Sequence, residues 1–257
     1  MGRASGDTAC SVQAEARSTG KERLSGGLAT QGVVRVGDTV RRPRQASSPF
    51  VAELLRVLDA AGFRGAPRYL GSDTQGREVF SYIPGDVPRH VRPFTDEQVS
   101  AAACLVRGFH DATRGTALAG EQEVVCHNDL NVRNVVLQDD VPVAWLDFDM
   151  AAPGEAITDV ATLAWGWCIS SWPPPRPVSE QGRQLRVLVD AYGVSDPQRR
   201  RLLDAIVGQQ RRLVAVAEAR IAAGADERIW TGVRDWAEGD LRFTLANAET
   251  LRPALYT

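Results

Sequence analysis

The chain has 257 residues, a hydrophobic fraction of 44%, a charged fraction of 24% and a formal net charge of -2. This length is enough to bury a sizeable core, and the charge balance excludes the strongly basic surface typical of nucleic-acid-binding proteins. No apolar run approaches the roughly 18 residues of a membrane span, and the four cysteines form no CxxC pair that would predict a zinc site. We therefore expect a cytoplasmic globular protein without a nucleic-acid, membrane or obligate protein partner.

The N-terminal region predicts a tail followed by a hairpin. Residues 1–22 lack the apolar segment of a signal peptide and are expected to form a flexible tail. Two short β-prone runs, 33–36 and 39–42, flank the turn residues Gly37-Asp38, which predicts a hairpin.

A helix and further strands complete a small lobe. The helix is expected to start at Ser47 or Ser48, with Pro49 in its first turn. The run EVFSYIPG at 78–85 predicts a strand that ends at a Pro-Gly break. We place this α+β lobe at residues 23–84. The apolar face of the helix, expected to cover the hairpin, consists of Val51, Leu54, Leu55 and Leu58.

The second lobe, residues 85–257, is predicted to be mainly helical. Thr95 and Gln98 form a capping box before an apolar periodic run. Short strands are expected on both sides of the polar segment 127–134, and another strand over 143–146. Later helices are expected to begin near Thr158, Glu180, Asp196 and Arg228.

The segment 127–134, HNDLNVRN, is dense in groups that orient hydroxyls, accept protons or bind metals. Its His127, Asp129 and Asn134 form the pattern HxDxxxxN. Asp147 follows thirteen positions after Asn134, at the end of an apolar strand. Alone, each feature is also typical of turn formers and strand caps.

Together these motifs resemble the catalytic loop and the metal-binding aspartate of the protein-kinase fold. The sequences HND and DFD, in place of HRD and DFG, are more similar to the aminoglycoside phosphotransferase family. The resemblance covers most of residues 24–170. It implies an α+β, two-lobed protein-kinase-like fold with a small β-rich N-lobe and a larger, mainly helical C-lobe. It also implies ATP or GTP as the phosphate donor.

Phosphoryl transfer depends on positioning and on charge neutralisation by Mg²⁺, so the residue types fit the chemistry. Asp129 is the candidate catalytic residue that accepts or orients the acceptor hydroxyl. Asn134 and Asp147 are candidate Mg²⁺ ligands, since Mg²⁺ prefers hard oxygen ligands. His127 is expected to brace the loop. Asp159 resembles a family position that supports the loop, and it is equally compatible with an ordinary acid in the first turn of a helix.

The nucleotide side departs from the kinase pattern, because the third strand carries Arg42 where kinases have lysine. Glu53 is a doubtful partner for Arg42, since it falls nearly opposite the apolar face of its helix. Further candidates for nucleotide binding are a glycine turn and the inter-lobe linker: Ser25, Gly26, Gly27, Ser81, Tyr82 and Ile83.

The acceptor side is the least defined. Asp149 is expected to share a side with Asp147 and could touch metal or substrate, or be solvated. Glu155 is a further candidate for substrate binding. Acids of the C-terminal helices could attract a cationic substrate, or be solvated. They are Glu218, Asp226, Glu227, Asp235, Glu238 and Asp240.

The leading hypothesis is Mg²⁺-dependent transfer of the nucleotide γ-phosphate to a hydroxyl of a small, cationic molecule. An aminoglycoside-like or peptide antibiotic is the first candidate, which would make the protein a resistance enzyme. Two alternatives remain open. One is a metabolic kinase for choline, an amino alcohol, a sugar or a nucleoside. The other is an inactive nucleotide-binding module.

Overall fold

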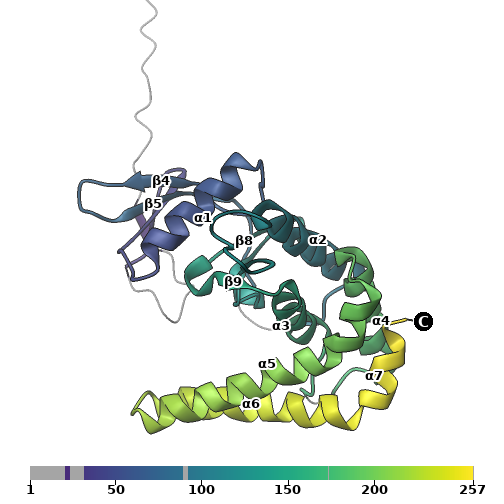
Figure 1. The fold of residues 1–257 in the computed structure, drawn as a ribbon. Coiled ribbons are helices and arrows are strands. Elements are labelled where there is room, and N and C mark those ends of the chain that lie inside the picture. Colours follow the sequence, from purple (N-terminus) through teal and green to yellow (C-terminus); the bar gives the residue numbers. More distant parts are fainter. Residues whose placement is uncertain (1–20, 24–31, 89–91, 173, 257) are drawn as a thin grey trace, which may run out of the picture.

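The computed structural model describes residues 21–23, 32–88, 92–172 and 174–256. Strands and one helix dominate the N-terminal part, whereas long helices make up most of the C-terminal part (Figure 1). The expected α+β architecture of two unequal lobes is therefore confirmed. The boundary after residue 84 stays a prediction.

The N-lobe is built on a five-stranded antiparallel sheet with the order β1-β2-β3-β5-β4. The expected hairpin is present as β2 and β3, and Gly37 at its turn has a φ of 59°. The strands are β1 (Lys21–Arg23), β2 (Val34–Val36), β3 (Thr39–Arg42), β4 (Tyr69–Ser72) and β5 (Glu78–Ser81).

Helix α1 (Ser48–Ala60) buries the predicted apolar face against β4 and the first C-lobe helix. Burial of such a face supplies most of the stability of a helix of this length. Ser47 precedes the helix, but its side chain makes no cap hydrogen bond and is used elsewhere.

The C-lobe starts with the long helix α2 (Asp96–Thr113), and the capping box of Thr95 and Gln98 is confirmed. The strands beside the polar segment do not pair with each other. Instead, β6 pairs with β9 and β7 pairs with β8. The small elements are β6 (Val124–Cys126), η1 (Val132–Asn134), β7 (Val135–Gln138), β8 (Val141–Trp145), η2 (Phe148–Met150) and β9 (Ala152–Gly154).

Five helices complete the C-lobe. Two of them begin two residues earlier than predicted. The residues that precede these two helices, Glu155 and Pro177, make no side-chain cap hydrogen bond, so the sequence carried no cap signal for the true starts. Among the described helices, none is both long and apolar enough to cross a membrane. The helices are α3 (Ala156–Cys168), α4 (Val178–Tyr192), α5 (Asp196–Ala222), α6 (Glu227–Ala246) and α7 (Ala248–Ala254).

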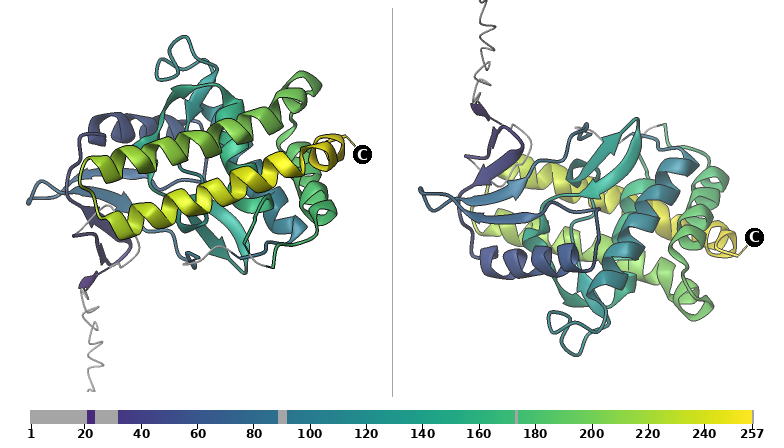
Figure 2. Two further views of the ribbon diagram at one scale, coloured as in Figure 1. Left: turned by 90° about the horizontal axis from the view of Figure 1, so that it is seen from below. Right: turned by 90° about the horizontal axis from the view of Figure 1, so that it is seen from above.

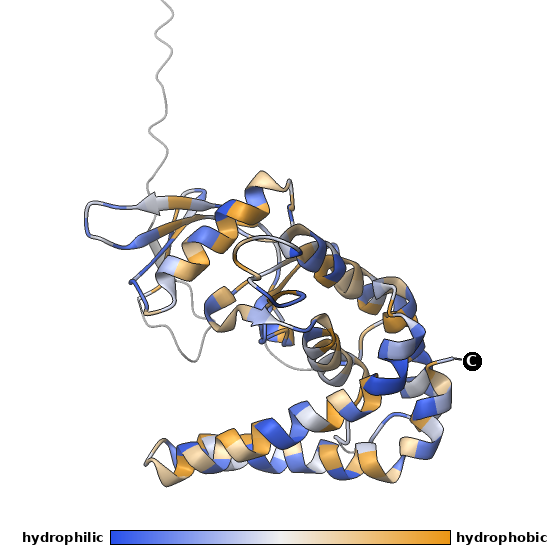
Figure 3. Cartoon of the chain, viewed as in Figure 1, coloured by the Kyte–Doolittle hydropathy of each residue, from blue (hydrophilic) through white to orange (hydrophobic). Residues whose placement is uncertain are grey.

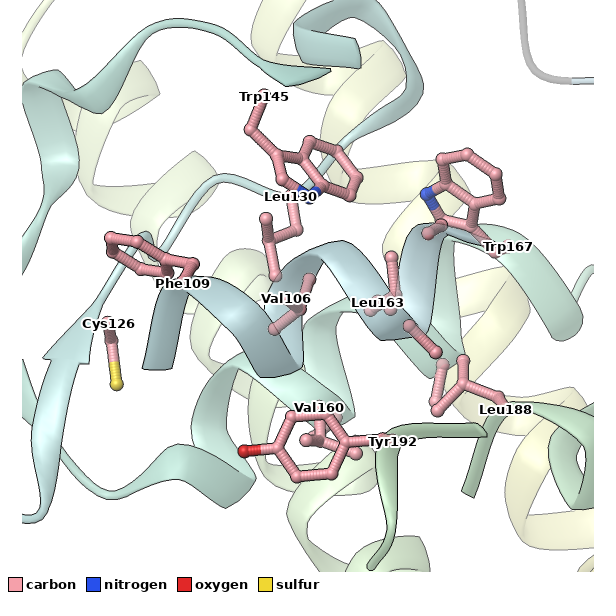
Figure 4. Packing of buried hydrophobic residues seen from close by; sticks show 14 of the residues in the cluster. Val106, Phe109, Cys126, Leu130, Trp145, Val160, Leu163, Trp167, Leu188 and Tyr192 are labelled. Carbon is pink, nitrogen blue, oxygen red and sulfur yellow. The ribbon is translucent and has the colours of Figure 1, made fainter. Parts of the chain in front are cut away.

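The main core lies where α2 and α3 cross beneath the polar segment. Figure 4 shows Val106 and Phe109 of α2 close to Leu130 of that segment and to Val160 and Leu163 of α3. Apolar and polar residues alternate around the helices (Figure 3), as expected for helices with one buried face. The polar segment therefore rests on a close-packed apolar base.

Helices α5 and α6 run side by side as a long hairpin along one side of the molecule (Figure 2). Near the body, residues such as Leu202, Leu203 and Ile206 are buried. Across residues 211–233, at the outer end, only Ala217 is buried. The outer end of the hairpin thus has little support beyond its own two helices.

The linker between the lobes is hydrogen-bonded to the C-lobe. Asp86 forms a β-bridge with Leu137, and the side chain of Gln138 donates to the carbonyl oxygen of Pro84 at 2.8 Å. Gly85 lies between Pro84 and Asp86 in the chain and has a φ of 137°. This close approach fixes where the chain enters the C-lobe.

Candidate active site

The start of the polar segment after β6 is held by hydrogen bonds to one buried carboxylate. Asp159 of α3 accepts hydrogen bonds from the backbone N–H groups of His127, at 2.6 Å, and Asn128, at 2.8 Å. His110 of α2 lies 2.9 Å from the same carboxylate, and both side chains are fully buried. Burial alone would raise the pKa of Asp159. The hydrogen bond and charge of His110 outweigh this effect and hold the pKa below its ordinary value.

His127 ties the segment to the chain just before Asp147. Its Nε2 donates to the carbonyl oxygen of Leu146 at 3.0 Å, and its Nδ1 accepts from the backbone N–H of Asp129 at 3.3 Å. Burial lowers the pKa of His127, so the imidazole is neutral at neutral pH. This bonding suits a bracing residue.

Two amide side chains hold the carboxylate of Asp129. Asn131 donates to its Oδ1 at 2.7 Å, and Asn134 donates to its Oδ2 at 2.7 Å. The side-chain oxygen of Asn131 in turn accepts from the backbone N–H of Arg133. The sequence assigns no role to Asn131, because nothing in its spacing shows which way its amide points.

The arrangement of Asn134 and Asp147 fits a hard divalent cation. Because the Nδ2 of Asn134 is committed to Asp129, its neutral Oδ1 is the end left for another ligand. The backbone N–H of Leu146 donates to the carbonyl oxygen of Asn134 at 2.7 Å, which keeps Asp147 beside the segment. Asp147 has a left-handed φ of 61°, a conformation that is uncommon outside glycine and clusters at functional sites.

The charge around Asp147 supports the same reading. Partial burial, and then the neighbouring carboxylates Asp149 and Asp129, raise the pKa of Asp147. Such mutual repulsion is relieved when a cation binds. The side-chain oxygen of Asn134 and the carboxylate of Asp147 would suit Mg²⁺ as ligands.

Arg42 of β3 is held between two carboxylates. Its Nε donates to Glu78 of β5 at 3.0 Å, and its two terminal nitrogens donate to both oxygens of Asp149 at 3.0 and 2.9 Å. The hydroxyl of Ser47 also donates to Asp149, at 2.9 Å. The sequence did not reveal Glu78 or Ser47 as partners, because their proximity depends on strand register and on how the lobes meet.

The expectation for Asp149 needs correction, whereas the doubt about Glu53 agrees with the structure. Asp149 lies in the 3₁₀ turn η2 rather than in an extended strand, and it is paired with Arg42 rather than solvated. Glu53 pairs with Arg56 on the exposed side of α1 and does not reach Arg42. Arg41, on the opposite face of β3, lies 3.6 Å from Asp73.

The inter-lobe linker continues the sheet through Tyr82, whose N–H donates to the carbonyl oxygen of Asp38 at 2.9 Å. The hydroxyl of Ser81 accepts from the backbone N–H of Arg68 at 2.8 Å. The N–H of Ile83 has no hydrogen-bond partner among the described residues, so it is available to a nucleotide base. The predicted glycine turn of Ser25, Gly26 and Gly27 lies outside the described residues.

Several of the acids proposed for substrate attraction are committed to other contacts. Glu155 pairs with Arg201 of α5 at 2.9 Å. Asp240 is buried and accepts from Trp165 and Ser171, so it is a structural residue. Others are committed too, because Asp226 caps α6 and arginines pair with Asp235 and Glu238.

Comparison with known proteins places this site in context. Residues 95–203, which include the polar segment and Asp147, match the model of the phosphotransferase enzyme family. Over 261 residues the chain is 29% identical to the trifolitoxin immunity protein of Rhizobium leguminosarum bv. trifolii. That alignment covers 90% of this chain and 97% of the relative.

Two solved structures illustrate the likeness in fold. A choline/ethanolamine kinase family protein from Mesorhizobium loti aligns with a TM-score of 0.61 and 18% identity, covering 93% of this chain and 92% of the other. The ternary complex of streptomycin, ATP and APH(2'')-IIa aligns with a TM-score of 0.54 and 12% identity, covering 93% and 94%. The two-lobed protein-kinase-like fold is therefore confirmed.

Proposed function

We propose that this chain, whose residues 95–203 match the phosphotransferase enzyme family, transfers the γ-phosphate of ATP or GTP to a hydroxyl of a small molecule. One observation carries the proposal. The carboxylate of Asp129 is held by two amides, while the free oxygen of Asn134 and the carboxylate of Asp147 lie beside it. Acceptor activation and metal binding are thus combined in one loop region.

Each residue has a distinct task in this mechanism. Asp129 orients the acceptor hydroxyl and takes its proton as the new bond from oxygen to the γ-phosphorus forms, while the bond from that phosphorus to the leaving nucleoside diphosphate breaks. Asn134 and Asp147 would hold Mg²⁺, which neutralises charge on the transferring phosphoryl group when bound. Arg42 would contact the α- or β-phosphate, and the linker around Ile83 would contact the base. His127 and Asp159 keep the segment in place.

The proposed acceptor is a hydroxyl-bearing toxin or antibiotic with cationic groups. The name of the relative describes immunity to trifolitoxin, and a phosphoryl group added to a toxin is one route to immunity. Support for a cationic acceptor comes from the carboxylates Asp129 and Asp147. On the C-terminal helices, Asp240 is buried, and Asp235 and Glu238 pair with arginines. This role would make the protein a resistance enzyme.

The test is a transfer assay with the purified protein, Mg²⁺ and either ATP or GTP. Mass spectrometry would detect the gain of one phosphoryl group on cationic and peptide antibiotics, choline and other amino alcohols, sugars and nucleosides. We expect modification of a toxin or antibiotic, and its loss in Asp129→Asn. Modification of a metabolite alone would favour a metabolic kinase. Nucleotide binding without transfer to any acceptor would favour an inactive module.

A further inference from the structure

Helix α1 offers no carboxylate to Arg42. Its two acids, Glu53 and Asp59, lie on the exposed side of the helix and pair with Arg56 and Arg64. The buried face of α1 consists of apolar residues and Ser48. A cation on the third strand must therefore be oriented by a group from another element.

The neighbouring strand supplies that group. In the antiparallel pairing of β3 with β5, Arg42 and Glu78 are directly opposite each other. The Nε of Arg42 lies 3.0 Å from Oε2 of Glu78, and the two side chains are only 12% and 1% exposed. A charge-assisted hydrogen bond at this burial is screened little by solvent.

The chemistry of the pair also points toward a ligand. The other oxygen of Glu78, Oε1, is buried and has no hydrogen-bond partner among the described residues. An unsatisfied buried oxygen destabilises the fold, so its presence indicates a functional role for the carboxylate. The bond to Nε fixes the plane of the guanidinium group and leaves its two terminal nitrogens pointing together at Asp149. The same pair of nitrogens is suited to grip a phosphate through two parallel hydrogen bonds.

We propose that Glu78 is a positioning residue that orients Arg42 for the nucleotide phosphates. This inference rests on the proposed function and adds a residue that its mechanism did not contain. Because the pair is set by strand register, the orientation of Arg42 is built into the sheet and does not depend on how α1 docks. Glu78 itself touches neither nucleotide nor acceptor.

The first test is the kinetic effect of Glu78→Gln, which keeps the shape of the side chain and removes its charge. We expect the KM for the nucleotide to rise about tenfold while kcat changes less than about threefold, because Asp129 is untouched. Glu53→Gln is the matched control on α1 and should leave both constants unchanged. An unchanged nucleotide KM in Glu78→Gln, or a raised one in Glu53→Gln, would overturn the inference.

A second measurement needs no nucleotide. The melting temperatures of Arg42→Ala, Glu78→Gln and the double variant report whether the two side chains are coupled. We expect the double variant to lose no more than the more damaging single variant, because each single change already breaks the pair. Additive losses would overturn the inference. Absence of transfer in the wild-type protein would instead count against the proposed function.

Discussion

At the scale of single residues, the orientation of Asp129 depends on the neighbouring amides. Asn131 contributes one of the two hydrogen bonds to this carboxylate, from an exposed position in the same segment. Without it, one carboxylate oxygen would turn toward water instead of toward the acceptor.

Asn131→Ala is therefore expected to lower kcat about tenfold with little change in the nucleotide KM, since a misplaced general base loses part of its usual effect. Steady-state kinetics with the acceptor found by mass spectrometry would check this. Arg133→Ala, at an exposed position two residues on, is the control and should be nearly silent. Equal effects of the two substitutions would mean that loop integrity, rather than the orientation of Asp129, is being measured.

Asp147 makes stability depend on pH in an unusual direction. Its pKa in the folded protein lies above the ordinary value of 3.8. The folded state thus binds this proton more tightly than the unfolded state, and stability is lost as the pH rises through the raised pKa. Asp147 is only partly covered and remains open to solvent, so solvent screens part of the effect.

Asp147→Asn should accordingly raise the melting temperature modestly at neutral pH in metal-free buffer. The gain should shrink on acidification and vanish below pH 3.8, where the aspartate is protonated in both states. Mg²⁺ should stabilise the wild type more than the variant. Asp139→Asn is the control, because Asp139 is exposed and also left-handed, with a φ of 49°. A gain of the same size in Asp139→Asn would show that backbone preference, rather than the burial and repulsion of the Asp147 charge, is responsible.

Sequence reasoning brought together the residues that are close along the chain and missed those joined by tertiary structure. His127, Asp129, Asn134 and Asp147 could be named because a short loop and a hairpin bring them together. Glu78 could not, because its contact with Arg42 depends on the register between β3 and β5. The sequence shows that an asparagine stands at position 131, but not that its amide donates to Asp129, because spacing along the chain does not fix a side-chain rotamer.

At the scale of elements, the linker is the most constrained connection. A Cβ atom at Gly85 would lie 2.3 Å from the carbonyl oxygen of Leu137, and the φ of 137° is open almost only to glycine. The linker and β7 approach each other this closely because the bridge at Asp86 holds them together.

Gly85→Ala should therefore lower the free energy of unfolding by at least about 2 kcal/mol, from backbone strain and steric overlap together. Chemical denaturation would measure the loss. Gly76→Ala is the matched control, since Gly76 also has a positive φ, of 74°, but a Cβ atom there would enter open space. It should cost only about 1 kcal/mol. Similar losses at both positions would mean that the linker is less tightly held than the contacts indicate.

Local signals predicted the hairpin, the buried face of α1 and the capping box, because periodicity and caps act within a few residues. These local signals did not predict which strands pair. The polar segment is flanked by β6 and β7, yet each strand pairs with a later one, β9 and β8. Those pairings follow from packing on α2 and α3, which periodicity does not encode.

At the scale of the whole molecule, the two ends of the α5–α6 hairpin differ in support. Its inner end packs into the body, where Gln210 donates to Thr244 at 2.9 Å between buried side chains. Its outer end, residues 211–233, is almost entirely unburied. From sequence, the acids on these helices could either attract a cationic substrate or be solvated. The pairing of Glu238 with Arg242, one turn away, could not be assigned from sequence.

Amide hydrogen exchange should therefore be faster across 211–233 than across α2 and α3, because local opening of the outer end exposes little apolar surface. Exchange measured by mass spectrometry on the intact protein would check this. Peptides from 202–210 of the same helix are the internal control and should be protected. Uniform protection along α5 would mean that the hairpin opens only with the whole lobe.

The poor support of the outer hairpin also bears on how this protein can diversify. A residue that contacts few others can be replaced at little cost in stability, so the outer hairpin can tolerate many substitutions. The polar segment cannot, because Asp159, His127 and both amides depend on one another. Selection can therefore alter the surface of 211–233 while the chemistry at Asp129 is preserved, which gives the fold a tolerant region and a constrained one within a single lobe.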